Sequence, residues 1–170
     1  MNIKMNTKKL VMAALMAALA CVATMAVKIP SPLHGYINLG DCIVLMRGWL
    51  LPPQYGFLAA GIGSAMADVF SGYAAYAPAT FVIKGLMAVV AYTVSATLHN
   101  RMNDTACRIA AGISAEIVMV AGYLAFETAL YGFVPSLANV PANMVQGTAG
   151  IIMGTILMKA FGKAGIEHIL

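Results

Sequence analysis

Long apolar segments, separated by short polar breaks, fill most of this chain. Hydrophobic residues make up 61% of its 170 positions and charged residues only 9%, whereas a soluble domain carries roughly 25% charged residues. A chain of this kind cannot cover a water-facing surface with polar groups, so we expect it to lie in a lipid bilayer. The same composition excludes a disordered chain and a disulfide-stapled secreted module.

Six of the apolar segments approach the length of a membrane span, which is roughly 20 helical residues. We predict an all-α integral membrane bundle of six transmembrane helices, forming a single domain over residues 1–170. The expected spans are about 10–27, 39–51, 54–70, 79–98, 106–130 and 140–161. The second is the weakest, because its residues before Pro52-Pro53 would cover only about 20 Å. It must be short, tilted or helped by the preceding loop.

Lysine and arginine residues set the orientation of the spans. With the N-terminus inside, only Lys28 and Lys84 lie toward the outside, and the cytoplasmic side takes Lys4, Lys8, Lys9, Arg47, Arg101, Arg108, Lys159 and Lys163. Basic residues beside spans favour the cytoplasmic side. We therefore predict a multi-pass protein of the cell membrane with both termini cytoplasmic. The net charge of +4 then reports topology, and we expect no nucleic-acid partner.

Polar side chains are predicted to gather at the outer ends of the spans. Ionisable groups inside a membrane are costly and are functional candidates, and amides in the last span follow at i, i+4 and i+7 on one helix face. Aromatic rings beside amides and carboxylates suit a small, flat, polar heterocycle. We predict a substrate-binding pocket that opens outward and is formed by His34, Tyr36, Asn38, Asp41, Asp68, Tyr73, Tyr76, Lys84, Glu127, Asn139, Asn143 and Gln146.

Several of these residues also have a purely structural interpretation. The tyrosines could form an interfacial belt, and Asp41 could cap the N-terminus of its helix. Asp68 and Lys84 could form a buried ion pair. Glu116 could be a carboxyl group that only packs between helices. These alternatives stay open at the level of sequence.

Signatures of catalysis, nucleotide binding and metal binding are missing from the sequence. Gly162-Lys163 is followed by Ala164 and lacks the upstream glycine of a phosphate-binding loop. There is no H-E-x-x-H, no paired His/Cys set for zinc and no complete G-x-S-x-G. We therefore predict no catalytic residue, no metal and no cofactor, and we expect a protein that is not an enzyme. Energy for active transport would have to come from partner proteins.

The first span carries a pattern of small residues. Ala13 and Ala17 share one stripe, and Ala14 and Ala18 share the next. Small residues four apart allow close helix–helix approach in lipid. The pattern fits either packing within this bundle or docking of a partner membrane protein.

These features together resemble the substrate-binding S component of energy-coupling-factor (ECF) vitamin transporters. The likeness lies in the basic N-terminus with an A-x-x-x-A first helix and in three stretches, Y-I-N-L-G-D at 36–41, A-D-V-F-S-G-Y at 67–73 and Y-A-P-A-T-F-V-I-K-G-L at 76–86. It covers nearly the whole chain.

The resemblance implies a location in the bacterial plasma membrane and an outward pocket covered by loops. It also implies partners: a transmembrane coupling protein and two cytoplasmic ATPases. The A-x-x-x-A face of the first helix would dock on the coupling protein, through Ala13 and Ala17 or through Ala14 and Ala18, and the whole subunit would topple in the membrane. The closest branch handles hydroxymethylpyrimidine, a thiamine precursor, or pyridoxine-like compounds. Riboflavin, pantothenate and folate remain alternatives, whereas cobalt or nickel is less expected because the N-terminal histidine ligands are absent.

Two other classes of function compete with this interpretation. A membrane enzyme at the outer leaflet could use Asp41, Asp68 or Glu127 as acid or base. A structural subunit or passive channel would need a polar stripe through the full depth of the membrane. The inner halves of the last three spans argue against a channel, because Glu116 is their main polar exception.

Overall fold

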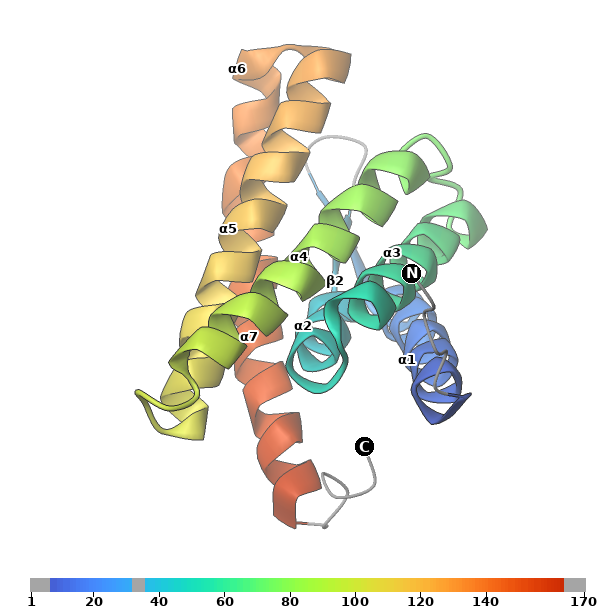
Figure 1. Ribbon diagram of the computed structural model, residues 1–170. Coiled ribbons are helices and arrows are strands. Elements are labelled where there is room, and N and C mark those ends of the chain that lie inside the picture. Colours follow the sequence, from blue (N-terminus) through green and yellow to red (C-terminus); the bar gives the residue numbers. More distant parts are fainter. Residues whose placement is uncertain (1–6, 32–35, 164–170) are drawn as a thin grey trace, which may run out of the picture.

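Six long helices form the body of the protein (Figure 1). The computed structural model describes residues 7–31 and 36–163. The long helices are α1 (Thr7–Ala26), α2 (Gly40–Leu50), α3 (Pro53–Phe70), α4 (Ala77–Leu98), α5 (Asp104–Tyr131) and α7 (Val140–Lys163). Each lies within a few residues of a predicted span.

The connections between the helices contain short elements that the sequence did not predict. β1 (Lys28–Pro30) pairs antiparallel with β2 (Tyr36–Asn38) in a small hairpin between α1 and α2. The expected break after α5 contains a helical turn, α6 (Phe133–Ser136), and a 3-10 turn, η1 (Leu137–Asn139). The all-α expectation therefore holds for the bundle but omits this hairpin.

The helix boundaries follow local sequence signals. Pro53 opens α3, where a missing backbone N–H costs nothing. Asn103 caps α5 by accepting a hydrogen bond from the backbone N–H of Ala106 at 2.9 Å. Gly72 follows α3 with a φ of +85°, a conformation that glycine adopts without the strain of a Cβ. These signals fix where the chain reverses at each end of the bundle.

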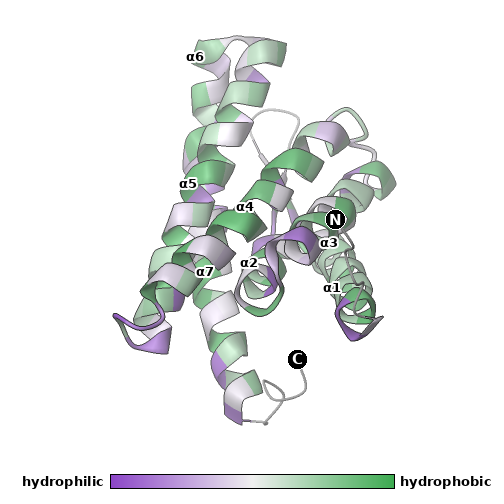
Figure 2. Ribbon diagram, in the orientation of Figure 1, coloured by the Kyte–Doolittle hydropathy of each residue, from purple (hydrophilic) through white to green (hydrophobic). Residues whose placement is uncertain are grey.

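Four helical segments of the described chain are long and apolar enough to cross a membrane: α1, α4, α5 and Phe133–Lys163. The 11 residues of α2 reach only about 16 Å at 1.5 Å per residue. Its residues from Gly40 to Gly48 are all buried, so protein rather than lipid surrounds this short helix. Hydrophobic residues, coloured green, occur along the length of the long helices (Figure 2).

Glycines bring α7 close to α2. A Cβ at Gly150 would lie 2.8 Å from the Cβ of Asp41, and one at Gly154 would lie 3.2 Å from the carbonyl oxygen of Cys42. A side chain at Gly150 would therefore overlap α2, and one at Gly154 would require α2 to shift by a few tenths of an ångström. As a result, Gln146, one turn before Gly150, lies beside Asp41.

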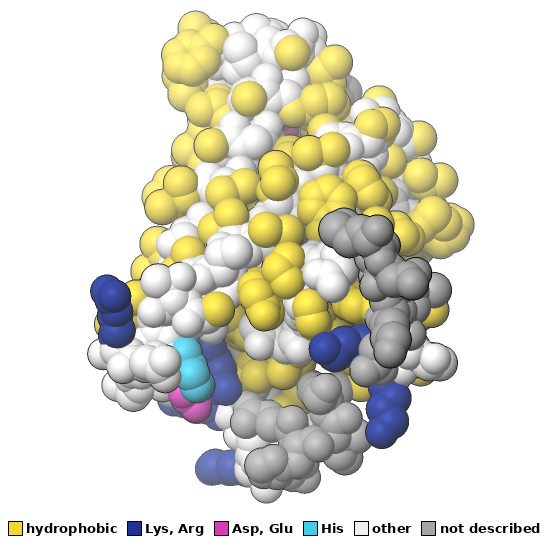
Figure 3. Space-filling model, in the orientation of Figure 1, with side chains coloured by type: hydrophobic (Ala, Val, Ile, Leu, Met, Phe, Trp, Pro, Cys, Tyr) yellow, Lys and Arg dark blue, Asp and Glu magenta, His cyan; other side chains and the backbone are white. Residues whose placement is uncertain are grey.

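The two ends of the bundle differ in chemistry. At one end, here called the pocket end, lie the hairpin, the α3–α4 connection and the α5–α7 connection. At the other, here called the basic end, lie the start of α1, the α4–α5 turn and the end of α7 (Figure 1). Lys and Arg gather toward the basic end, and hydrophobic side chains cover much of the visible surface above it (Figure 3). The placement of both termini in the cytoplasm stays a prediction.

Candidate functional site

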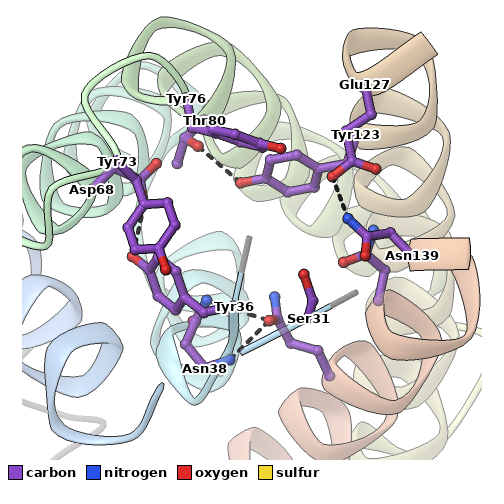
Figure 4. Close-up of a pocket in the computed structure, with 12 residues that line it drawn as sticks. Ser31, Tyr36, Asn38, Asp68, Tyr73, Tyr76, Thr80, Tyr123, Glu127 and Asn139 are labelled. Atoms are coloured by element: carbon purple, nitrogen blue, oxygen red, sulfur yellow. Dashed lines mark hydrogen bonds between the residues drawn. The ribbon is translucent and has the colours of Figure 1, made fainter. Parts of the chain in front are cut away.

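A pocket at the pocket end collects polar and aromatic side chains from the hairpin and four helices (Figure 4). It is lined by Ser31, Tyr36, Asn38, Asp68, Tyr73, Tyr76, Thr80, Tyr123, Glu127, Asn139, Asn143 and Gln146. The free space inside is about 40 Å³, whereas a cavity of roughly 150 Å³ holds benzene. Side chains or the hairpin must therefore move to admit an aromatic ligand.

The hairpin forms one wall of the pocket and is fastened to the end of α3. The Tyr36 hydroxyl donates a hydrogen bond to Asp68 Oδ1 at 2.7 Å, and Lys28 Nζ donates one to Ser71 Oγ at 2.7 Å. The rings of Tyr36 and Tyr73 lie 4.9 Å apart. Burial, followed by the Asp68 carboxylate, raises the pKa of Tyr36, so this hydroxyl keeps its proton and remains a donor.

The opposite wall comes from α4, α5 and η1. Thr80 Oγ1 and the Tyr123 hydroxyl are hydrogen-bonded at 3.0 Å. Asn139 Nδ2 donates to Glu127 Oε1 at 2.7 Å. The ring of Tyr76 packs edge-on against Phe126, with centroids 5.2 Å apart. This wall therefore offers aromatic surface together with oxygen atoms.

The floor of the pocket is held by a chain of hydrogen bonds through Gln146. Its Oε1 accepts from the backbone N–H of Asn38 at 2.9 Å and from Asn38 Nδ2 at 3.3 Å. Its Nε2 donates to Asp41 Oδ2 at 2.6 Å, and the other oxygen of Asp41 pairs with Lys84 Nζ. Both edges of the Gln146 amide are thus used by the protein, and strand β2 is tied to the core.

Asp41 and Lys84 lie behind the pocket and do not line it. Asp41 is fully buried and Lys84 is 3% exposed. A buried ion pair between Asp68 and Lys84 was one interpretation of the sequence, but Lys84 pairs with Asp41 instead. The α2 N-cap is Leu39 without a side-chain hydrogen bond, so Asp41 is not the cap. Since α2 runs inside the bundle, its Asp41 faces α4 and α7 instead of the pocket.

Most of the predicted site residues come together. The structure places nine of them in the lining: Tyr36, Asn38, Asp68, Tyr73, Tyr76, Glu127, Asn139, Asn143 and Gln146. His34 lies outside the described residues. The prediction omitted Ser31, Thr80 and Tyr123. Thr80 and Tyr123 precede Lys84 and Glu127 by one helical turn, and this spacing was the signal that could have identified them.

The two alanine pairs of α1 face different surroundings. Ala13 is buried, and a Cβ at Gly63 of α3 would lie 2.4 Å from the carbonyl oxygen of Ala17. Ala14 and Ala18 are exposed. Packing within the bundle therefore explains the first pair and leaves the second pair on the surface.

The chemical groups of the lining define what the pocket can contact. Among the described residues, no group of three or more His, Cys, Asp or Glu side chains could hold a metal ion. The lining combines stacking surfaces with amide, hydroxyl and carboxylate groups, which can satisfy the polar edge of a heterocycle.

Comparisons with known proteins agree with this architecture. The family model described as "ECF-type riboflavin transporter, S component" matches residues 4–163. A relative from Pyrococcus woesei, "Uncharacterized protein in gap 3'region", is 36% identical over 148 residues, which is 83% of this chain and 95% of the relative.

Two solved structures share the fold. The structure reported as "Structure and mechanism of the S component of a bacterial ECF transporter" has a TM-score of 0.70 at 21% identity and covers 92% of this chain and 96% of its own. An S component for biotin from an ECF-type ABC transporter has a TM-score of 0.57 at 18% identity, and the match covers 94% of this chain and 95% of that structure's chain.

Proposed function

Because the chain belongs to the ECF-type S component family, we propose that it binds a small water-soluble vitamin or vitamin precursor in its pocket and delivers it for import. The family and the structural neighbours are transporter subunits, not enzymes. One observation carries the proposal: polar and aromatic side chains meet in a pocket at one end of a bundle whose outer surface is apolar.

Hydroxymethylpyrimidine or pyridoxine is the substrate that we favour. Either compound is a single aromatic ring with hydroxyl or amino groups, which suits tyrosine rings beside amides and carboxylates. Tyr36, Tyr73 and Tyr123 provide the stacking surfaces, and Asn143 and Glu127 lie beside them. Riboflavin, named in the description of the family model, is the first alternative, followed by pantothenate and folate.

We further propose that the pocket end faces the outside of the cell membrane and that both termini are cytoplasmic. The gathering of Lys and Arg toward the basic end supports this orientation. A vitamin carried through the bilayer must have its polar groups satisfied within the protein, since each unsatisfied group in hydrocarbon costs several kcal/mol. The hairpin, which is hydrogen-bonded to the end of α3, is consistent with a pocket that is covered before transport.

The partners that we propose are a transmembrane coupling protein and two cytoplasmic ATPases, with the subunit toppling against the coupling protein. The exposed pair Ala14 and Ala18 is the better docking face, because Ala13 and Ala17 are used inside the bundle. We expect Ala14→Trp with Ala18→Trp to lower vitamin uptake by cells and to leave vitamin binding by the purified chain unchanged. Lost binding would show that these residues pack the bundle.

Thermal unfolding of the purified chain across a panel of vitamins tests the proposed function. A ligand at 100 times its dissociation constant stabilises the folded state by about 2.7 kcal/mol. We expect one compound of the panel to raise the unfolding temperature at micromolar concentration. If none of the vitamins does so, the proposal of a vitamin-binding subunit is refuted.

A further inference from the structure

The pocket presents two carboxyl groups to its ligand, one on each side. Asp68 comes from the last turn of α3 and Glu127 from the last turns of α5, and they flank the pocket in Figure 4. None of the described residues in the lining is Lys, Arg or His. Among the described residues of the lining, the ionisable carboxyl groups are therefore not balanced by a basic side chain, and the other polar groups are neutral hydroxyls and amides.

Each carboxyl group has one oxygen in use and one oxygen free. Asp68 Oδ1 accepts from Tyr36, and Glu127 Oε1 accepts from Asn139. Asp68 Oδ2 and Glu127 Oε2 are buried and have no hydrogen-bond partner among the described residues. A buried acceptor without a donor is costly. These two oxygens are unsatisfied acceptors that a ligand can complete, and the Tyr76 hydroxyl of the same lining is a further buried polar group without a partner among the described residues.

The nearest cations are engaged elsewhere. Lys84 pairs with the fully buried Asp41, and its Nζ lies 5.5 Å from the ring centroid of Tyr123. Lys28 lies on the exposed surface of the hairpin and donates to Ser71. Neither lysine belongs to the lining of the pocket.

We propose that the pocket selects uncharged or cationic heterocycles carrying hydrogen-bond donors at two separate positions, and that it rejects carboxylated and phosphorylated compounds. One donor meets Asp68 Oδ2 and the other meets Glu127 Oε2. The faces of the surrounding tyrosine rings add an attraction for positive charge. This inference rests on the proposed function and narrows it, because Asp68 and Glu127 then determine specificity by charge.

Ligands that share one ring and differ in a single substituent provide the test. The first series is 4-amino-2-methylpyrimidine with a hydroxymethyl, an aminomethyl or a carboxylate group at position 5. The second is pyridoxine, pyridoxamine and 4-pyridoxic acid. Equilibrium binding to the purified full-length chain should be at least about tenfold weaker for the carboxylate than for the aminomethyl member, since a charged hydrogen bond is replaced by repulsion.

Two variants assign the effect to the pocket. Asp68→Asn and Glu127→Gln keep the shape of the side chain and remove its charge. Each should reduce the preference for the aminomethyl over the carboxylate ligand by about tenfold. Asp104→Asn is the matched control, because it removes the same charge from an exposed side chain at the basic end. It should leave the preference unchanged.

The outcomes separate this proposal from the function on which it rests. If the carboxylate ligand binds as tightly as the aminomethyl ligand, the selection by charge is refuted and vitamin binding stands. A preference that survives both pocket variants unchanged would refute the roles of Asp68 and Glu127. A protein that binds no member of either series and no vitamin of the panel would lose the proposed function, and this inference with it.

Discussion

Replacing Lys84 with methionine removes the only ion-pair partner described for a fully buried carboxylate. Asp41 has no solvent-exposed surface, and Lys84 is 3% exposed. Methionine fills nearly the same volume as lysine, so the substitution tests the charge and not the packing. Asp41 would keep one described side-chain hydrogen bond, from Gln146 Nε2 at 2.6 Å.

We expect a large loss of stability, because Lys84→Met leaves the buried Asp41 carboxylate without its ion-pair partner. Removing one partner of a buried ion pair costs about 3–5 kcal/mol, whereas replacing both partners with neutral groups is often close to neutral. We therefore expect Lys84→Met to lower the free energy of unfolding by about 3–5 kcal/mol. The double variant Asp41→Asn with Lys84→Met should recover most of that loss, since the asparagine oxygen can still accept from Gln146.

The unfolding free energies of the single and the double variant can be measured by denaturant unfolding in detergent micelles, with helical circular dichroism as the signal. The matched control is Lys159→Met, because this lysine is exposed on α7 and its removal should leave the unfolding free energy unchanged. The double-mutant cycle isolates the coupling between the two side chains. A single variant as stable as the wild type, or a double variant no more stable than the single, would refute the argument.

Three further substitutions test separate parts of the structure. Glu116→Gln should leave stability unchanged or raise it, because both carboxyl oxygens of Glu116 are buried and have no hydrogen-bond partner within residues 7–31 and 36–163; a loss above about 2 kcal/mol in the same unfolding assay would contradict this. Tyr36→Phe removes the hydrogen bond to Asp68 and should weaken vitamin binding several-fold by calorimetry, with unchanged affinity as the opposing result. Gly63→Leu should separate α1 from α3, since even a Cβ would lie 2.4 Å from Ala17 O, and a variant with wild-type unfolding temperature would disprove that close contact.

The helices could be predicted from the sequence because bilayer-length apolar runs with polar breaks leave few alternatives. The polar break around Arg101 and the proline pair at the start of α3 marked two reversals of the chain. The hairpin was not predicted because β1 and β2 have only three residues each, which is too few to show the alternating pattern of a strand. Its stability comes from contacts with α3 and α7 that are distant in sequence.

The pocket could be predicted in outline but not in detail. The position of a residue along a predicted span gives its depth in the membrane. On this basis Asp68, Glu127 and Gln146 were predicted to lie at the same end of the bundle. The same reasoning placed Asp41 and Lys84 in the lining, since depth does not reveal which way a side chain faces around the helix. That direction depends on α2 lying inside the bundle and on the glycines of α7, which only the packed structure shows.

A structure of the full chain with its stabilising vitamin bound tests the central claim most directly. We predict that the vitamin lies between the hairpin and Tyr123, with polar groups directed at Asp68 and Glu127. The described chain has other hollows, one beside Trp49 and His99 at the basic end and one between α5 and α7 beside Glu116. A vitamin found in either of these hollows, with the pocket end empty, would contradict the account.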